Sequence, residues 1–412
     1  MKVLFVGIQF DRELEATYLS NSKSGLSAAA NEFQWNVCDG LIDCVDDDME
    51  ILSALPVGVY PRHYKKFLLN SRDWTYRGIQ VTEIGSINLP IFKQYQREQA
   101  CHKRIKKWIE DTPNEQHLII LYSLYTPYLR AISRVIKENE SVRAVMIVTD
   151  LPGEYGLLPQ NKVSAYFALK TGKEAMNLAK GLHGFVLLTE DMKYPLKIGT
   201  KPYVVVEGIT KPLTSNYGIK YNHTSPKYIL YTGTLNKAYG IMHLLDAFSL
   251  IKDSEVELWI CGTGEAESDI KEHSQTNSRI KYLGFQMKEA VLNLQANAMV
   301  LINPRTTAGE YTKYSFPSKT IEYLASGVPV VMHKLPGIPA EYDDYIVFAE
   351  DDSDAALARA LNGVICWDNG TRTAFGDRGK KFVECSKNPI AQAQKIFALG
   401  EKCMGIPDQS KS

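Results

Sequence analysis

Short apolar runs rich in β-branched residues recur along the chain, and helical stretches separate them. The runs are mostly continuous, as expected for strands buried on both faces of a sheet. They lie at 2–8, 117–122, 143–149, 185–189 and 202–207, and again at 228–231, 256–261, 280–283, 298–303, 328–332 and 346–348. Because helical patterns such as 241–251, 289–296 and 355–361 lie between them, we expect parallel sheets covered by helices on both faces.

The two series of strands predict two doubly wound α/β domains. A polar, turn-rich stretch at 208–226 separates the series, and a chain of 412 residues is long enough for two domains. We therefore expect an N-terminal domain at 1–210, a C-terminal domain at 211–387, and a C-terminal helix and tail at 388–412. That helix is amphipathic and could pack on either domain, including back on the N-terminal one.

The composition excludes several classes of protein. Lys and Arg together number 47, as do Asp and Glu, which argues against a nucleic-acid binder. No apolar run approaches the ~18 residues of a membrane span, and residues 1–8 predict a buried strand rather than a signal peptide. The seven cysteines are odd in number and include no Cys-x-x-Cys pair. We therefore expect a cytoplasmic protein without a disulfide framework or zinc site.

Charge is uneven within the first domain. Residues 1–55 carry three basic and ten acidic side chains, whereas residues 56–110 carry eleven basic and four acidic ones. Within 60–108 the bases are mixed with aromatic residues, as in Tyr64-Lys65-Lys66-Phe67. This mixture is typical of peripheral contact with an anionic membrane, here the inner membrane, and equally of a solvated protein surface.

Residues 310–331 predict a loop, a short helix and a buried strand. Ser318 is the expected N-cap of a helix over 319–326, with Lys319 and Glu322 on one face. Free N–H groups at the helix start, together with the lysine, can bind a diphosphate, and the carboxylate can accept hydrogen bonds from sugar hydroxyls. Together they predict a nucleotide-sugar site, although the helix alone fits an ordinary surface helix with a solvated ion pair equally well.

Loops that contain glycine or proline follow four strands of the second series in order. A glycine turn between a strand and a helix lets a phosphate approach backbone N–H groups. Gly262-x-Gly264 alone is incomplete as a dinucleotide-binding fingerprint, so the four loops matter together. The candidate donor-binding residues in these loops are Gly233, Thr234, Lys237, Gly262, Gly264, Gly284, Phe285 and Arg305.

The order of these motifs resembles the nucleotide-sugar domain of GT-B glycosyltransferases of family 4. The motifs are Tyr-Thr-Gly-Thr-Leu at 231–235, Ile-Cys-Gly-Thr-Gly at 260–264, Tyr-Leu-Gly-Phe at 282–285, Asn-Pro-Arg at 303–305, Ser-Phe-Pro-Ser-Lys at 315–319 and Glu-Tyr-Leu-Ala-Ser-Gly-Val-Pro-Val-Val at 322–331. The resemblance covers about 226–350 and is closest to bacterial members that build capsule, O-antigen or exopolysaccharide. It implies two Rossmann-like domains facing a central cleft, a donor in the C-terminal one, an acceptor in the N-terminal one, retention of anomeric configuration, and no required metal or cofactor.

The resemblance also implies roles for single residues. Glu322 corresponds to the second glutamate of the family's Glu-x7-Glu pair, which holds the ribose, but Tyr314 stands at the first position. Glu310 could supply that role from further along the loop, or the role could be absent. The expected catalytic residues are therefore Glu310, Lys319 and Glu322, and the signature Ser315, Phe316, Pro317 and Ser318 joins the donor site.

The family's usual arginine and lysine after the first glycine loop are missing. Their positions hold Thr234 and Tyr239. Other cations must then balance the diphosphate, and the candidates are Lys319, Lys237, Arg305 and Lys313.

On the acceptor side the family often has a histidine in the strand-end loop that matches 121–125. Here Tyr122 stands in that loop and is a candidate acceptor-binding residue. Asp150 ends another predicted strand and could face the cleft, but it also suits a turn before a proline. Ser24 and Gly25 could bind the acceptor or belong to an ordinary N-cap. The acidic run 46–48 is interpreted as a solvated turn, so no metal site is predicted.

The sequence therefore predicts a retaining glycosyltransferase. Its donor would be a nucleoside-diphosphate sugar, and its acceptor a glycan or lipid-linked molecule in bacterial surface polysaccharide biosynthesis. Two alternatives stay open. One is a nucleotide-sugar epimerase of the same fold, and the other is a non-catalytic nucleotide-sugar-binding partner subunit, which the missing cations would favour.

Overall fold

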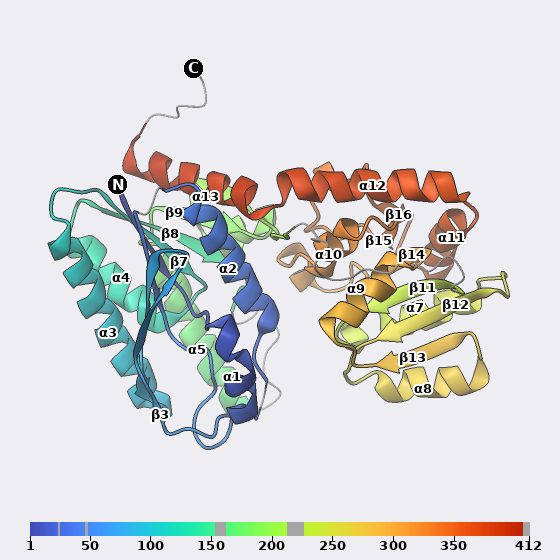
Figure 1. The fold of residues 1–412 in the computed structure, drawn as a ribbon, viewed down its shortest axis with the longest axis horizontal. Helices are drawn as coiled ribbons and strands as arrows, with labels where there is room; N and C mark the ends of the chain where they lie inside the picture. The colour runs from blue at the N-terminus through green and yellow to red at the C-terminus, as the bar shows by residue number, and fades with distance from the viewer. Residues whose placement is uncertain (24, 46–47, 153–161, 212–225, 407–412) are drawn as a thin grey trace. The chain divides into compact units, whose positions relative to one another are not determined.

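The computed structural model describes residues 1–23, 25–45, 48–152, 162–211 and 226–406. The chain divides into two compact units, one formed by Met1–Ile209 with Pro389–Ser412 and the other by Thr210–Asn388 (Figure 1). Each unit contains one main sheet. Among the described residues, no helix combines the length and the apolar character that crossing a bilayer requires.

The N-terminal unit is built on an eight-stranded sheet with the order β10-β9-β8-β7-β1-β2-β5-β4. Neighbouring strands are parallel except at the edge, where β4 runs antiparallel to β5. A separate antiparallel pair joins β3 to β6. The strands are β1 (Lys2–Val6), β2 (Met49–Ser53), β3 (Leu68–Leu69), β4 (Arg72–Tyr76), β5 (Ile79–Glu83), β6 (Ser86–Ile87), β7 (His117–Tyr122), β8 (Val142–Val148), β9 (Gly184–Leu187) and β10 (Tyr203–Val205).

Helices cover this sheet on both faces. The unit contains α1 (Glu15–Asn21), α2 (Ala28–Ile42), α3 (Pro90–Asp111), α4 (Thr126–Glu138), α5 (Lys162–Ala179), α6 (Lys193–Leu196) and α13 (Pro389–Met404). Leu41 of α2 and Ile396 of α13 share one buried cluster with Phe5 of β1, while α3 and α4 lie across the sheet from α2 in Figure 1. The C-terminal helix α13, whose partner the sequence left open, therefore packs on the N-terminal unit.

The C-terminal unit contains a six-stranded sheet with the order β13-β12-β11-β14-β15-β16, and every neighbouring pair is parallel. Its strands are β11 (Lys227–Thr232), β12 (Val256–Cys261), β13 (Ile280–Gly284), β14 (Val300–Asn303), β15 (Val330–His333) and β16 (Val347–Ala349). Its helices are α7 (Ile241–Ser249), α8 (Glu267–Thr276), α9 (Lys288–Ala296), α10 (Lys319–Ala325), α11 (Asp354–Ile365) and α12 (Asn369–Ser386). Ile229 and Leu230 of β11 belong to different buried clusters. Since neighbouring residues point to opposite faces, both faces of the sheet are covered.

The predicted α/β class with parallel sheets is confirmed. Every predicted strand falls on an observed strand, with ends that agree to within two residues. Strands β2, β3, β4, β5 and β6 were not predicted. Two of them, β4 and β5, alternate between buried and exposed residues as edge strands do. The purely parallel expectation was wrong at this edge, and most of the predicted linker lies outside the described residues.

The contact between α2 and α13 gives a test of how the C-terminal helix is held. A Cβ atom on Gly40 of α2 would lie 2.0 Å from the carbonyl oxygen of Pro389, whereas a Cβ on Gly363 of α11 would meet nothing within 4 Å. Gly40→Ala should therefore destabilise the protein by about 2 kcal/mol. Gly363→Ala should instead stabilise α11 by up to about 1 kcal/mol. Thermal unfolding of both variants measures this difference, and midpoints that shift in the same direction would contradict it.

Candidate functional site

The strand order of the C-terminal unit changes direction between β11 and β14. From β11 the sheet continues to β12 and β13, and from β14 it continues to β15 and β16. In doubly wound sheets ligands bind at the carboxyl edge beside such a switch point. The loops after β11 and β14 meet there, because a Cβ on Gly240 would lie 2.0 Å from Pro304 O and Tyr311 Oη donates a hydrogen bond to Ala238 O at 3.0 Å.

The predicted glycine loops interlock at this edge. The N–H of Gly233 donates to Cys261 O at 3.0 Å, and the N–H of Gly262 donates to Gly284 O at 2.9 Å. Gly262 has a φ of 140°, and a Cβ there would lie 1.8 Å from Gly233 O. At Gly264 a Cβ would lie 2.5 Å from the oxygen of Leu235. These two glycines are therefore required for loop packing, whatever else they contact.

Helix α10 presents the predicted Lys319 and Glu322 beside these loops. Lys319 Nζ lies 2.9 Å and 3.0 Å from the two carboxylate oxygens of Glu322, and both side chains are half-buried. Ser318 stands at the N-cap position, but its side chain makes no capping hydrogen bond. The predicted helix start at Lys319 and the N-cap position of Ser318 are confirmed. The side-chain cap is absent because the backbone of Ser318 is already helical, and Pro317 O accepts a hydrogen bond from Thr320 N at 2.8 Å.

A residue that the sequence did not single out positions Glu322. Gln295 of α9 is fully buried, and its Nε2 donates to Glu322 Oε1 at 2.7 Å and to Thr232 Oγ1 at 3.1 Å. Thr232 in turn is held by Tyr323, whose hydroxyl accepts from Thr232 N at 2.8 Å. The carboxylate is thus fixed from β11, α9 and α10 together. No motif marks Gln295, and its contact follows only from the packing of α9 against β11.

The other residues predicted for the donor site fall into two groups. Phe316 and Pro317 are buried, and the Phe316 ring contacts Tyr342 at 5.4 Å between centroids, so they anchor the loop. At the surface lie Thr234, whose carbonyl accepts from Tyr231 Oη at 2.9 Å, Phe285, and Glu310, which pairs with Lys313 at 3.3 Å. Among the described residues, Glu310 forms no hydrogen bond or ion pair with Lys319 or Glu322.

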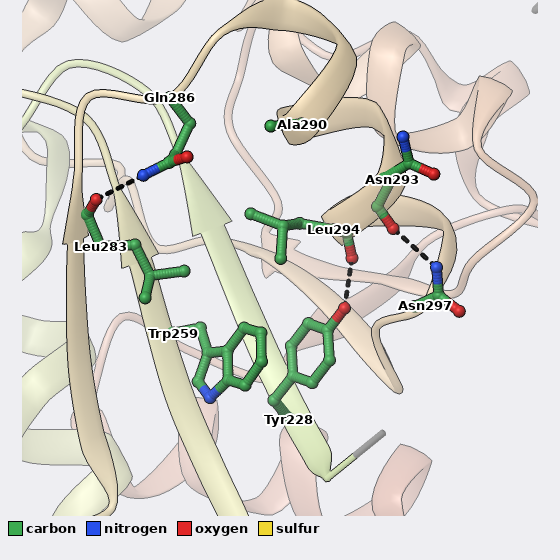
Figure 2. A pocket seen from close by; sticks show the side chains of 8 residues that line it. All are labelled: Tyr228, Trp259, Leu283, Gln286, Ala290, Asn293, Leu294 and Asn297. Carbon is green, nitrogen blue, oxygen red and sulfur yellow. Dashed lines mark hydrogen bonds between the residues drawn. The ribbon is translucent and has the colours of Figure 1, made fainter. Parts of the chain in front are cut away.

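The structure also contains a hollow of about 460 Å³ on the C-terminal unit. Figure 2 shows the stacked rings of Tyr228 and Trp259, 4.0 Å apart, facing side chains of α9. Its lining residues are Tyr228, Trp259, Leu283, Gln286, Ala290, Asn293, Leu294 and Asn297. None of the predicted donor residues is among them, so we place the candidate site at the carboxyl edge and not in this hollow.

The N-terminal sheet carries a buried polar cluster at its carboxyl edge that sequence reasoning also missed. Glu83 ends β5 and is 5% exposed, and burial raises the pKa of its carboxyl to about 7. Arg97 donates to Leu55 O at 2.7 Å, while Arg72 pairs with Asp11 at 2.8 Å. Glu83 Oε2 accepts no hydrogen bond within the described part of the chain. Each residue lies far from the others in sequence, so only the strand order brings them together.

The residues predicted for acceptor binding are scattered. Tyr122 is 3% exposed and belongs to the core, where burial raises its pKa to about 12. Asp150 follows β8 at the surface, although desolvation still raises its pKa. Gly25 is exposed with a φ of 76°. Ser24 lies outside the described residues, as do two members of the acidic run at 46–48.

Comparisons with known proteins address the fold. Residues 226–366 match the family described as Glycosyl transferases group 1, and no curated protein matches the sequence. Among solved structures, sucrose-phosphate synthase from Thermosynechococcus elongatus is similar with a TM-score of 0.65 and 12% identity, covering 98% of this chain and 100% of that one.

Two further solved structures are similar over nearly the whole chain. One is described as trehalose-6-phosphate from E. coli bound with UDP-2-fluoro glucose, with a TM-score of 0.64, 9% identity, and coverage of 98% of this chain and 100% of that one. The other is the lipopolysaccharide outer core galactosyltransferase WaaB, with a TM-score of 0.60, 14% identity, and coverage of 97% and 99%. At these identities the likeness shows the fold, and it confirms the predicted GT-B architecture.

The buried Glu83 gives a prediction for pH dependence. Its pKa is raised in the folded protein to about 7, mainly by burial. A raised carboxyl pKa means that stability is highest below the unfolded pKa and is lost as the pH rises from about 4.5 to 7. Glu83→Gln should remove up to about 3 kcal/mol of that loss. Denaturation of both proteins from pH 4 to 8 measures it, and parallel stability curves would contradict it.

Proposed function

We propose that this chain, a glycosyltransferase of the GT-B fold, transfers a sugar from a nucleoside diphosphate to a glycan or lipid-linked acceptor, with retention of anomeric configuration. The observation that carries the proposal is the network of Lys319, Glu322 and Gln295 beside the switch point between β11 and β14. It supplies a cation for a diphosphate and an oriented carboxylate for sugar hydroxyls. A role in bacterial surface polysaccharide assembly is supported by the motif resemblance over 226–350.

The network suits a donor because Lys319 and Glu322 can give up their contact with each other and bind the donor instead. Without a ligand, Lys319 and Glu322 neutralise each other at 2.9 Å. A bound donor brings ribose hydroxyls, which donate to Glu322, and phosphate oxygens, which accept from Lys319. The side-chain amide Nε2 of Gln295 donates to Glu322 Oε1 throughout this exchange, so the carboxylate stays oriented when Lys319 turns to the phosphate.

The reaction needs charge stabilisation more than a nucleophile. The bond between the anomeric carbon and the diphosphate oxygen breaks, and its electron pair leaves with the diphosphate. The acceptor hydroxyl oxygen forms the new bond on the same face, and its proton passes to the departing oxygen. Cationic side chains stabilise the growing negative charge, and the protein holds both reactants in position. We therefore expect no requirement for a metal or other cofactor.

Donor binding is the first test of this proposal. UDP, GDP, ADP, CMP and their common sugar conjugates are screened by thermal shift and titration calorimetry. Glu322→Ala should weaken the tightest ligand about ten- to a hundredfold, because it removes charge-assisted hydrogen bonds. Gln295→Leu should weaken it about three- to tenfold by leaving Glu322 without its positioning donor. Glu272→Ala, which changes an exposed carboxylate on α8, is the control and should bind as the unchanged protein does.

The same samples separate the alternatives. Slow hydrolysis of the sugar conjugate, or transfer to an added acceptor, supports the transferase. Conversion of the donor sugar to its epimer without any acceptor would establish the epimerase instead. Binding without turnover would favour a non-catalytic partner subunit, and stabilisation by no nucleotide would remove the donor site from α10.

We also propose that the N-terminal unit contacts an anionic membrane surface, which would suit a lipid-linked acceptor. Large exposed apolar side chains gather around the start of α3, namely Tyr60, Phe67, Leu68, Ile91, Phe92 and Tyr95. Backbone hydrogen bonds from Tyr60 to Asn88 at 2.9 Å and from Asn88 to Phe67 at 2.7 Å bring the segments together. Arg62, Lys65 and Lys66 are exposed beside them. Such a surface suits acidic lipids.

Vesicle binding tests this surface. Changing Ile91 and Phe92 to Ser removes apolar area that would enter the interface, and we expect about a tenfold loss of binding to vesicles with a third phosphatidylglycerol. The matched control changes Tyr166 and Phe167 to Ser, which are as exposed but lie on α5. Sedimentation with neutral phosphatidylcholine vesicles should show weak binding for every protein. Equal losses of vesicle binding in the two double variants would contradict the assignment of the membrane contact to this surface.

A further inference from the structure

Three of the four cations predicted for the diphosphate are engaged with carboxylates. Lys319 pairs with Glu322 at 2.9 Å, Lys237 with Asp269 at 2.9 Å, and Lys313 with Glu310 at 3.3 Å. Arg305 differs from them. Within the described part of the chain, no carboxylate lies within ion-pairing distance of its guanidinium, and its Nε is buried without a hydrogen-bond partner. A half-buried cation without a counter-charge is ready to accept an anionic ligand.

Aromatic rings hold this arginine in place. The guanidinium carbon of Arg305 lies 4.2 Å from the ring centroid of Tyr239 and 5.8 Å from that of Tyr311. Arg305 Nη1 reaches Ser315 Oγ at 3.5 Å. Tyr311 is itself anchored, because its hydroxyl donates to Ala238 O at 3.0 Å. The side chain is thereby fixed between the loop after β11 and the loop after β14, at the switch point of the sheet.

The position of Tyr239 in the sequence suggests what the Arg305 side chain replaces. Tyr239 directly precedes Gly240 and α7, and it stands where the motif resemblance places a lysine in related glycosyltransferases. Its ring instead carries the guanidinium of Arg305 on its face. The positive charge missing from the glycine loop is therefore supplied at the same place by a residue of a different loop.

We infer that Arg305 binds the donor diphosphate together with Lys319, with Tyr239 and Tyr311 as the positioning residues of Arg305. The inference rests on the proposed function and deepens it. A guanidinium stacked on a ring keeps its N–H groups in one plane at the ring's edge, so it can donate two parallel hydrogen bonds to phosphate oxygens. Stacking also limits the side-chain freedom that binding would otherwise remove.

A charge-relocation experiment tests this inference. The probe is whichever of UDP, GDP and ADP stabilises the unchanged protein most, and its dissociation constant is measured by calorimetry. Arg305→Met should weaken binding about ten- to a hundredfold, since it removes charge-assisted hydrogen bonds. Adding Tyr239→Lys to that variant restores a cation at the position of the ring. We expect it to recover most of the affinity.

Arg378→Met is the matched control, because Arg378 also lies over an aromatic ring, that of Phe375 at 5.3 Å, but on the exposed surface of α12. It should bind the probe as the unchanged protein does. Wild-type affinity in Arg305→Met would overturn the inference and leave the donor site standing. A loss that Tyr239→Lys does not recover would also overturn it, because the loop and not the charge would then be responsible.

Arg305→Lys covers the case in which the methionine variant does not fold. It keeps the charge and loses the planar fork, so binding should weaken about three- to tenfold, and unchanged binding would overturn the inference. If the unchanged protein bound no nucleoside diphosphate, the proposed function itself would fall, and the inference with it. That outcome differs from every result in which only the Arg305 variants depart from expectation.

Discussion

The donor edge depends on the contact between two backbone segments. Gly233 O lies 1.8 Å from where any Cβ of residue 262 would stand, so the loops after β11 and β12 can only touch if residue 262 is glycine. That contact sets the path of 233–240, which then reaches the loop after β14 at Gly240 and Pro304. Further backbone hydrogen bonds hold the same loop, since Leu235 N–H donates to Thr263 O at 2.9 Å and Ala266 N–H donates to Leu235 O at 2.9 Å. Close backbone contacts therefore position side chains from two loops, including Tyr239 beside Arg305.

Three of the four cations at the proposed donor site are paired with carboxylates. Lys319, Lys237 and Lys313 each have a carboxylate neighbour, and these pairs are partly exposed, so each contributes little to stability. Their weakness is useful for a site, since a phosphate can displace a carboxylate from a partly solvated lysine at little energetic cost. Arg305 needs no such exchange, because aromatic faces and not a carboxylate surround its guanidinium. The proposed site therefore combines Arg305, whose guanidinium has no carboxylate to give up, with Lys319, which must leave Glu322 to bind a phosphate.

The carboxyl edge of the N-terminal sheet follows a different principle. There the burial of Glu83 raises its pKa to about 7, and the burial of Lys93, next to Arg97, lowers its pKa to about 7. Both shifts favour the neutral form of the side chain. This happens when the cost of removing a charged group from water exceeds what its ion pairs return. At the same edge Asp11 pairs with Arg72 at 2.8 Å. The stability of the N-terminal unit should consequently depend on pH between about 4.5 and 7. Among the described residues of the proposed donor edge, no buried carboxyl has a pKa raised in this way.

How far the sequence could predict this molecule depended on whether a feature was local. Continuous apolar runs identified the parallel strands, and the glycines and Lys319 with Glu322 pointed to the carboxyl edge proposed for the donor, because each signal lies within a few residues. Gln295 could not be found in that way, since its contact with Glu322 needs α9 to lie over β11. Arg305 was named as one cation among four. Its distinction appears only when the strand order brings Tyr239 to it.

The N-terminal half shows the same limit more strongly. Glu83, Arg97 and Arg72 carry no motif, and β4 and β5 alternate like ordinary edge strands. Their meeting is decided by sheet order and by α3 packing over it, which no window of the sequence contains. Aromatic and basic residues at 60–108 gave only a choice between a membrane surface and a solvated one. Packing shows what the counts of charges hide. Glu98 is buried against Arg130 and Arg134, while Arg72 and Arg77 of this segment pair with Asp11 and Asp43. Which bases keep a carboxylate neighbour is therefore decided by contacts between distant parts of the chain, so the charge pattern of the segment alone could not separate the two choices.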